Sequence, residues 1–364
     1  MSGSEGVKME MKNKLWLLMI LISLLVFSNG SKATSFIGHR EEDVISVYDQ
    51  EGNYVFGTAM GVSAGDIYIN EDNNEYLVET VNGSRAIAKK VGEVDLMENF
   101  SGKAGILTPI AAQGKKLIGI YHTHNGESYL PGPENVEGHG EIHTIGRELS
   151  KALEQKGIEV SMLDNLHLPH DGAAYTRSRA TALDLARKGP DAIFDVHRDA
   201  VPRKEEYLKN VNGQLVSQVR FVVGRQNPNK KVNDKFARQL KAVADKKYPG
   251  LVKGIFYGRG TYNQEISPRS LLLEFGSHVT TKEQAGVSTQ MMADTISSLL
   301  YGEEGEAVKT GDNRSAFSTI AWIVGILIVA ILVFLFINEG SLAGVIKRIK
   351  GFFGREIFDR GNGN

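Results

Sequence analysis

The chain has 364 residues, a formal net charge of −1 at pH 7 and 23% charged residues. This balance gives no sign of the strongly basic face of a nucleic-acid binder, so we expect no nucleic-acid partner. Cysteine is absent. That excludes thiolate metal sites, a cysteine nucleophile and disulfides, so His, Asp or Glu must hold any metal.

Residues 1–34 resemble an export signal or an amino-terminal membrane anchor. Lys8, Lys12 and Lys14 precede an uncharged, mostly apolar stretch from Leu15 to Phe27. The small residues that follow include a Ser-x-Ala spacing at 31–33 that is typical of a cleavage site. The stretch is only slightly shorter than a bilayer span, so both a cleaved signal and an uncleaved anchor fit the pattern.

Residues 35–108 predict a small β-rich unit. Short apolar runs at 44–48, 54–56, 66–69 and 76–78 are separated by Gly, Asn and Asp, which are strand and hairpin signals without a helical period. No chemistry is evident in this unit. It is interpreted as a spacer or as a partner-binding module.

Residues 115–301 alternate between strand and helix patterns. Strands are expected at 117–121, 159–163, 192–196, 219–223 and 270–275, and helices at 145–156, 176–188, 232–248 and 281–300. This alternation predicts an α/β fold, an open sheet with helices on both faces. Ligands should then gather at the carboxyl ends of the strands.

The carboxyl-terminal part of the chain predicts a second membrane segment. Residues 302–315 are interpreted as a flexible linker, and residues 316–338 carry no charge over 23 residues, enough for a transmembrane helix. Residues 339–364 predict a basic amphipathic tail with Lys347, Arg348 and Lys350. The positive-inside rule places this tail in the cytoplasm, so the protein is expected in the cell membrane with the part between its two membrane segments extracytoplasmic.

Histidines follow two of the expected strands. His122 and His124 come directly after the strand at 117–121, and His197, Arg198 and Asp199 follow the strand at 192–196. Histidine is the commonest nitrogen ligand of Zn²⁺, and the ends of two strands can meet at one edge of a sheet. The pattern therefore predicts a metal site.

Several motifs in this order resemble the stage II sporulation protein P family. They are YHTHNGESYLP at 121–131, DVHRDA at 195–200, KKYPGL at 246–251, YNQ at 262–264 and LLLEFG at 271–276. The resemblance covers about residues 117–300. The family comprises exported cell-wall hydrolases that are themselves similar to zinc-dependent N-acetylmuramoyl-L-alanine amidases. The carboxyl-terminal span and basic tail depart from the family pattern.

The resemblance implies a zinc amidase-like fold and a Zn²⁺ enzyme acting on peptidoglycan. It would cut the amide between N-acetylmuramic acid and the L-alanine of the stem peptide during sporulation-type wall remodelling, and endopeptidase activity stays open. The membrane and other extracytoplasmic wall-remodelling proteins are the expected partners. A different zinc hydrolase, such as a peptidase or deacetylase, and a non-catalytic wall-binding scaffold are the alternatives.

The matched positions also suggest roles for individual residues. His124, Glu141 and His197 are the expected metal ligands, with His122 and Glu127 as alternates, and such a set leaves an open position for water.

Glu274, at the end of an apolar strand, is the expected catalytic general base. Arg198 is a candidate for binding a stem-peptide carboxylate, and Asp199 for orienting an imidazole. Ordinary salt bridging is the alternative for both.

Overall fold

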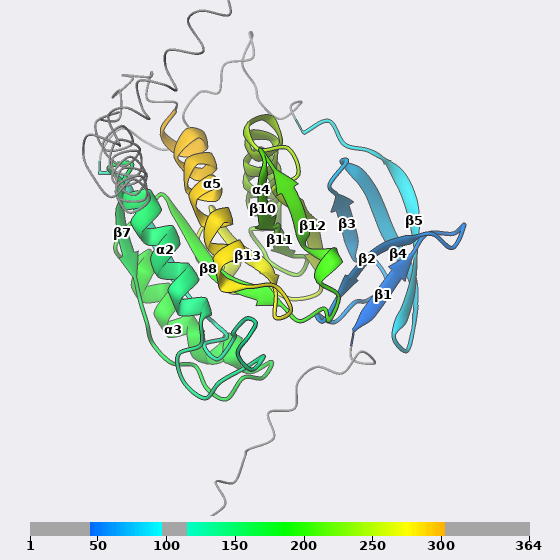
Figure 1. Ribbon diagram of the computed structural model, residues 1–364, viewed down its shortest axis with the longest axis horizontal. Helices are drawn as coiled ribbons and strands as arrows, with labels where there is room; N and C mark the ends of the chain where they lie inside the picture. The colour runs from blue at the N-terminus through cyan, green and yellow to red at the C-terminus, as the bar shows by residue number, and fades with distance from the viewer. Residues whose placement is uncertain (1–43, 97–114, 303–364) are drawn as a thin grey trace, which may run out of the picture. The chain divides into compact units, whose positions relative to one another are not determined.

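The computed structural model describes residues 44–96 and 115–302, and its centre is a mixed sheet of eleven strands (Figure 1). The strand order is β2-β1-β5-β4-β3-β12-β11-β13-β8-β6-β7. The strands of this sheet are β1 (Ile45–Tyr48), β2 (Tyr54–Thr58), β3 (Ile67–Asn70), β4 (Asn74–Asn82), β5 (Arg85–Glu93), β6 (Leu117–Tyr121), β7 (Glu159–Met162), β8 (Ala192–Asp199), β11 (Val219–Gly224), β12 (Val252–Gly258) and β13 (Ser270–Ser277).

Four α-helices and a short hairpin complete the described fold. The helices are α2 (Ile142–Glu154), α3 (Ala174–Ala186), α4 (Lys230–Lys247) and α5 (Lys282–Tyr301). The hairpin pairs β9 (Leu208–Val211) with β10 (Gln214–Ser217), and single turns of 3-10 helix lie at η2 (Lys204–Glu206) and η3 (Gln264–Ile266). The strands and helices expected over 115–301 are therefore present, with element ends shifted by a few residues, but β12 was not expected from the sequence.

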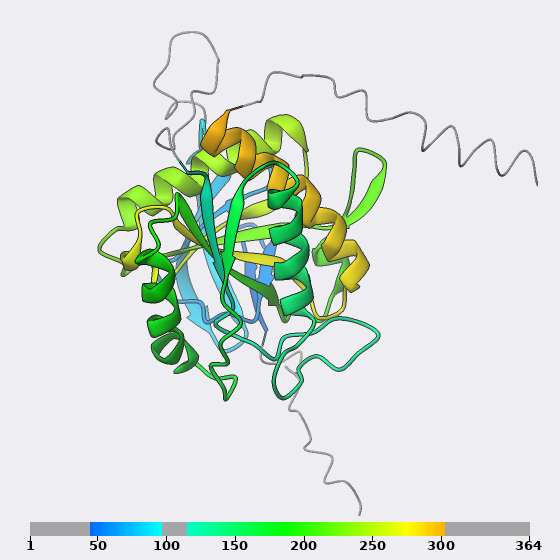
Figure 2. The same ribbon diagram turned by 90° about the vertical axis from the view of Figure 1, so that its left-hand side faces the viewer.

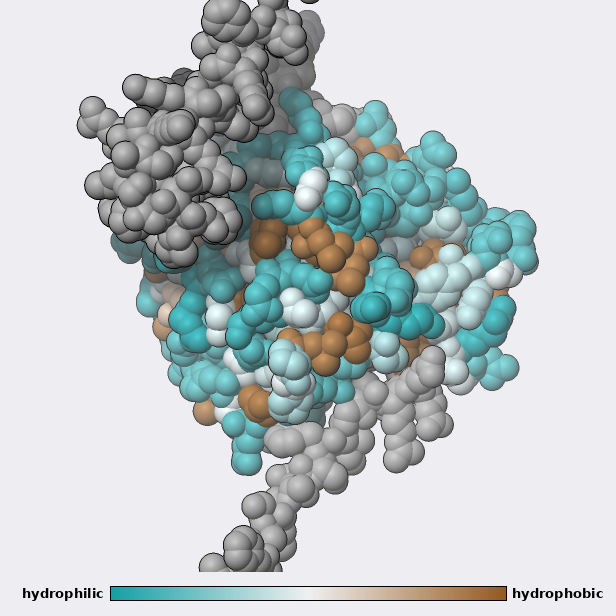
Figure 3. Space-filling view, viewed as in Figure 1, coloured by the Kyte–Doolittle hydropathy of each residue, from teal (hydrophilic) through white to brown (hydrophobic). Residues whose placement is uncertain are grey.

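Helices cover both faces of the sheet. Buried side chains of α2, α4 and α5 pack in one core with Ile120, Phe194 and Leu273. On the opposite face, Ala182 and Leu185 of α3 pack against Tyr121 and Ile193, and Figure 2 shows α2 and α3 on opposite sides of the strands. The face shown in Figure 3 is mostly hydrophilic, with apolar residues in small separate groups, as amphipathic helices over an apolar core require.

The amino-terminal strands are β-rich as expected, but they do not form a separate unit. Strand β3 pairs antiparallel with β12, so β1–β5 extend the same sheet. A second core joins Phe56 and Tyr68 of these strands to Val222 and Leu272 of the central strands. The close approach of β12 to β3 requires glycine at position 254, because a Cβ there would lie 2.4 Å from the carbonyl oxygen of Ile69. The expectation of a separate unit is corrected, whereas a role in binding a partner stays a prediction.

Strand β8 runs three residues further than the apolar pattern indicated. It includes His197, Arg198 and Asp199, and all eight of its residues are buried. Because side chains alternate along a strand, His197 and Asp199 lie on the α3 face with Ile193, while Arg198 points the other way. The polar residues are thus part of the sheet.

No helix in residues 44–96 and 115–302 is long and apolar enough to cross a membrane. The expected signal or anchor at 1–34, the span at 316–338 and the basic tail at 339–364 lie outside the described residues, as does the linker beyond Gly302.

Replacing Ile69 should test whether β1–β5 belong to the same folding unit. Ile69 on β3 is fully buried and packs in the core of the central strands. Ile69→Ala should lower the free energy of unfolding by about 2–5 kcal/mol, because it deletes buried methyl groups and leaves a cavity. Chemical denaturation followed by circular dichroism should still show a single transition.

The matched control is Val81→Ala on the half-exposed part of β4, which should change stability by about 0.5 kcal/mol or less. Two separate transitions, with Ile69→Ala shifting only one, would show that the amino-terminal strands fold independently.

Candidate active site

A cavity of about 290 Å³ opens at the carboxyl ends of β8 and β13. Its walls come from six parts of the chain: residues 59–61 after β2, the 124–127 turn after β6, the 170–175 segment at the start of α3, the end of β8, Tyr262 after β12, and β13. Cavities at strand ends are the usual place for catalytic groups in an α/β sheet. The cavity therefore defines the candidate site.

Three potential metal ligands meet in this cavity. The Nδ1 atoms of His124 and His197 both lie 3.3 Å from Oε1 of Glu127. The ligand atoms of the three residues fall within 4.8 Å of one another. His124 and His197 were the expected histidine ligands, and Glu127 was the alternate carboxylate. The structure thus brings two imidazoles and one carboxylate to a single point.

Further contacts hold the cluster rigid. Asp195 Oδ1 lies 2.9 Å from Nε2 of His197, and the same carboxylate accepts hydrogen bonds from the backbone N–H and hydroxyl of Thr123 at 2.8 and 2.6 Å. Glu127 Oε2 accepts the N–H of Arg198 at 2.8 Å. A carboxylate on the far nitrogen of a ligating imidazole is the usual support of a metal site, because it fixes the ring and its tautomer.

The charges of the cluster suit a cation. Burial works against the charged form of Glu127, but His197, His124 and Arg198 hold the pKa of this carboxyl well below its ordinary value. Burial also disfavours protonation of His197, yet Asp195 and Glu127 raise the pKa of that imidazole well above its ordinary value. Two buried carboxylates thus call for a positive charge beside His197. A divalent cation can supply it in place of the proton.

Glu141, the expected carboxylate ligand, does not join the cluster. It lies at the amino end of α2, where Oε1 accepts from Nζ of Lys282 at 2.8 Å and Oε2 from the N–H of Tyr129 at 3.1 Å. Its side chain is 32% exposed. This placement corrects the expectation: Glu141 joins the start of α2 to α5, and Glu127 takes its place in the cavity.

His122 faces the other side of the sheet. Its Nδ1 lies 2.8 Å from the carbonyl oxygen of Val196, and its ring packs against His143 of α2. Gly146 leaves the space for this ring, since a Cβ there would lie 2.4 Å from Nε2 of His122. His122, the alternate histidine ligand, does not join His124 in the cavity, because β6 ends at Tyr121 and the chain turns.

His122, His143 and Asp164 form a second cluster of potential ligands. The amide of Asn125 lies with its nitrogen 3.2 Å from Nε2 of His143, and its oxygen accepts the N–H of His167. This orientation leaves Nε2 as the acceptor, so Nδ1 of His143 carries the proton and donates it to Asp164 at 3.0 Å. The cluster is a hydrogen-bonded support for the 122–125 turn.

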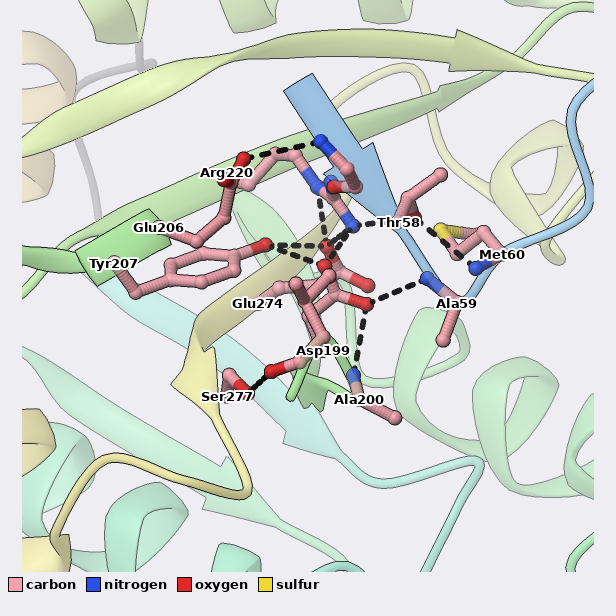
Figure 4. Close-up of polar contacts among 12 residues, drawn as sticks. Thr58, Ala59, Met60, Asp199, Ala200, Glu206, Tyr207, Arg220, Glu274 and Ser277 are labelled. Carbon is pink, nitrogen blue, oxygen red and sulfur yellow. Dashed lines mark hydrogen bonds and ion pairs between the residues drawn. The ribbon is translucent and has the colours of Figure 1, made fainter. Parts of the chain in front are cut away.

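Glu274 lines the same cavity as the metal-ligand cluster, on the strand next to that of His197. Figure 4 shows it beside Arg220, Tyr207 and Asp199. Its Oε2 accepts a hydrogen bond of 2.6 Å from Nε of Arg220 and one of 3.5 Å from the Tyr207 hydroxyl. Burial raises the pKa of Glu274 to about 7, with Arg220 lowering it and Asp199 raising it. A carboxyl group that titrates near neutral pH beside a potential metal site has the properties of a general base.

Arg198 and Asp199 have different contacts from those expected. The Arg198 guanidinium is buried and donates to the carbonyl oxygens of Ser128, Glu134 and Asp199 and to Oδ1 of Asn135. It therefore holds the 128–135 loop and is not free to bind a substrate carboxylate. Asp199 pairs with Arg220 at 2.8 Å and accepts from the Tyr207 hydroxyl at 2.9 Å, so it orients these groups and not an imidazole.

The sequence reading overlooked three kinds of site residue. Asp195 and Arg220 are charges within apolar strands, the same signal that drew attention to Glu274. His170 stacks on His124 at 4.2 Å, and burial, then His124, lower its pKa to about 4, so it lines the cavity as a neutral imidazole. Tyr175 and Tyr262 add an aromatic wall; Tyr262 belongs to the YNQ motif, but no site role was predicted for either tyrosine.

The sequence model of the stage II sporulation protein P (SpoIIP) family matches residues 61–297. The chain belongs to this family. A curated member, stage II sporulation protein P of Bacillus subtilis (strain 168), is 31% identical over 247 residues, which cover 62% of this chain. The match spans 61% of that relative's own length. The family match begins within the amino-terminal strands, in keeping with their place in the sheet.

Two of the solved structures to which the chain is similar are N-acetylmuramoyl-L-alanine amidases. N-acetylmuramoyl-L-alanine amidase AmiC2 of Nostoc punctiforme matches at a TM-score of 0.32 and 18% identity, over 52% of this chain and 97% of that chain. The N-acetylmuramyl-L-alanine amidase Ami1 of Mycobacterium smegmatis matches at a TM-score of 0.34 and 15% identity, over 53% and 99%. At these scores we draw neither fold nor chemistry from the likeness.

Replacing Arg198 should distinguish a loop-holding role from substrate binding. Arg198→Met leaves several buried carbonyl acceptors of the 128–135 loop without their donor, so the free energy of unfolding should fall by about 2 kcal/mol or more. Urea denaturation of the metal-free protein measures this loss. The control is Arg187→Met, whose pair with Asp184 is largely exposed and which should cost about 1 kcal/mol or less. Unchanged stability in Arg198→Met would leave the guanidinium free for a substrate.

Proposed function

We propose that this protein is an extracytoplasmic, zinc-dependent peptidoglycan hydrolase that cleaves the amide between N-acetylmuramic acid and the L-alanine of the stem peptide. The observation that carries the proposal is the meeting of His124, Glu127 and His197 in one cavity with Glu274. Membership of a sporulation family supports a role in the cell wall.

The donor set fits zinc. Two imidazole nitrogens and one carboxylate oxygen are a usual ligand set of catalytic zinc, and they leave a position open. His197 has Asp195 on its other nitrogen, and Glu127 has one oxygen occupied by the Arg198 N–H and the other directed at both imidazoles. Zinc in this site would lower the pKa of a bound water to about 7 and polarise the amide carbonyl.

Glu274 would act as the general base and then as the general acid of the reaction. Its hydrogen bonds from Arg220 and Tyr207 both go to Oε2, so Oε1 is the oxygen available to take a proton from the attacking water. The same carboxyl can then pass the proton to the amine of the departing L-alanine. With a pKa of about 7, Glu274 can both accept and release a proton near neutral pH.

The aromatic wall is suited to a large polar substrate. Tyr175 and Tyr262 lie edge to face with ring centroids 5.2 Å apart, and both line the cavity with His170. Their flat surfaces can pack against a sugar ring or a peptide plane. A peptidase or deacetylase could use the same metal ligands, and additional endopeptidase activity also fits. A non-catalytic scaffold has less support, because the proposed ligands and the proposed general base all line the described cavity.

We further propose that the protein is tethered to the cell membrane, with the cavity on the outer side and the basic tail inside. The sequence segments at 1–34 and 316–338 support this topology. Other extracytoplasmic wall-remodelling proteins are then natural partners.

Metal content and product release in matched glutamate variants test the proposed chemistry. Glu127→Gln should lose most bound zinc and all activity, since a ligand charge is gone. Glu141→Gln should keep both. Glu274→Gln should keep zinc but lose about 10²- to 10⁴-fold in rate, the usual contribution of a general base. Elemental analysis and mass spectrometry of muropeptides incubated with the full-length protein give the two readouts.

The product identifies the bond. Free stem peptide with intact L-alanine indicates the amidase, whereas shortened peptides indicate a peptidase. A mass loss of about 42 Da, which corresponds to an acetyl group replaced by hydrogen, indicates a deacetylase. Full zinc content in Glu127→Gln together with zinc loss in Glu141→Gln would reverse the carboxylate assignment.

The pH dependence of the rate should reflect the protonation of Glu274. A general base works only when deprotonated, and the pKa of Glu274 is about 7. The ratio kcat/KM should therefore fall as the pH drops below about 7, and a nearby bound cation would move this limb somewhat lower. Assays of a soluble muropeptide across pH measure it. A rate that stays constant down to the ordinary glutamate pKa of 4.5 would contradict the role of Glu274.

A further inference from the structure

Arg220 is a fully buried arginine with a partner for each guanidinium nitrogen (Figure 4). Nε donates to Oε2 of Glu274 at 2.6 Å, and Nη2 donates to Oδ2 of Asp199 at 2.8 Å. Arg220 also lies directly opposite Glu274 in the pairing of β11 with β13. Backbone register and side-chain hydrogen bonds thus both join this arginine to the proposed general base.

The remaining donors of Arg220 reach the amino-terminal strands. Nη1 donates to the carbonyl oxygen of Gly57 at 3.0 Å, and Nη2 to the hydroxyl of Thr58 at 2.8 Å. Thr58 is fully buried at the end of β2. The next residue, Ala59, donates its N–H to Oδ1 of Asp199 at 3.1 Å. The end of β2 therefore holds both Arg220 and Asp199.

The chain that follows β2 forms part of the cavity wall. Ala59, Met60 and Gly61 line it together with Glu274. The Met60 N–H donates to the Thr58 hydroxyl at 3.0 Å, so the same side chain that accepts from Arg220 also fixes this wall. One threonine thus connects the arginine to the surface that faces the substrate.

We propose that Arg220 is a positioning residue for Glu274, and that Thr58 of the amino-terminal strands fixes Arg220 for this task. This inference rests on the proposed function. A glutamate side chain has three rotatable bonds, and a general base must lie within hydrogen-bond reach of the proton that it takes. The guanidinium fork holds Oε2 and leaves Oε1 for the cavity. The end of β2 therefore helps to position the proposed base.

A structural ion pair is the competing interpretation of the same contacts. In that case Arg220 would only stabilise the sheet, and its replacement would reduce the amount of folded enzyme without changing the rate per folded molecule. Positioning instead predicts a lower kcat at constant KM and constant zinc content. It also predicts that the loss depends on Glu274 being present.

Two variants of the full-length protein separate these interpretations. Arg220→Lys keeps the charge but lacks the planar fork, so it cannot bond Glu274, Asp199 and Thr58 together. Its kcat on a soluble muropeptide should fall about 10- to 100-fold. Thr58→Val removes only the hydroxyl and should lower kcat by about tenfold, since the lost hydrogen bond is to a charged group. KM should stay within about twofold, as expected for loss of a transition-state interaction.

Matched controls come from similar contacts outside the cavity. Arg238 of α4 pairs with Asp234 and Glu75 and lies over the Tyr257 ring, so Arg238→Lys also disturbs an arginine that reaches the amino-terminal strands. Thr295→Val removes a buried hydroxyl from α5. Both controls should leave kcat unchanged. Thermal unfolding and zinc analysis of all variants confirm that folded, metal-loaded protein is compared.

A double-mutant cycle with Glu274→Asp decides between the positioning role and the structural ion pair. Shortening the carboxylate by one methylene keeps a base but removes it from the reach of Arg220. In this background Arg220→Lys should lower kcat by no more than about twofold, because the coupling between the two residues is already lost. Losses that multiply, or an unchanged kcat in Arg220→Lys, would overturn the positioning role. Failure of the wild-type protein to release any product would instead reject the proposed function.

Discussion

Three neighbouring strands carry the site in a single row. Arg220 of β11 lies opposite Glu274 of β13, and Glu274 lies beside His197 of β8. Residues in register on adjacent strands have Cβ atoms about 4.5–5.5 Å apart, so the pairing brings the arginine, the carboxyl and the imidazole together. A shift of one residue would turn Glu274 toward the helices and Leu273 toward the cavity, which would remove the proposed base.

This register is enforced by the apolar side chains between the polar ones. Leu271, Leu273 and Phe275 alternate with Leu272 and Glu274 and pack in the core under α2, α4 and α5. Burying these side chains fixes the face on which Glu274 appears. The polar row is costly because buried charges must be paired, and here each has partners: Arg220 with Asp199 and Glu274, and His197 with Asp195 and Glu127. The free energy gained by burying the apolar face offsets the free energy lost in desolvating the charges of the polar face.

The sequence was sufficient to predict those site residues that lie at the ends of apolar strand patterns. His124, His197 and Glu274 each follow or end an apolar run, and parallel strands bring such positions to one edge of the sheet, so their meeting was foreseeable. The choice between Glu127 and Glu141 was not, because it depends on how the turn after β6 folds back. Arg220 is 54 residues from Glu274 and pairs with it only through a strand order that local periodicity does not give.

Burial of apolar side chains also explains why β1–β5 pack against the central strands. The central strands carry apolar side chains on both faces, so both faces must be covered. Helix α3 covers β6 and β8 on the cavity side, but Val222 and Leu272 of the next strands need other partners, which Phe56 and Tyr68 supply. Once β2 lies over these strands, its end meets Arg220 through Thr58. The apolar contact that completes the fold therefore also completes the polar row, and the amino-terminal strands cannot be separated from the site.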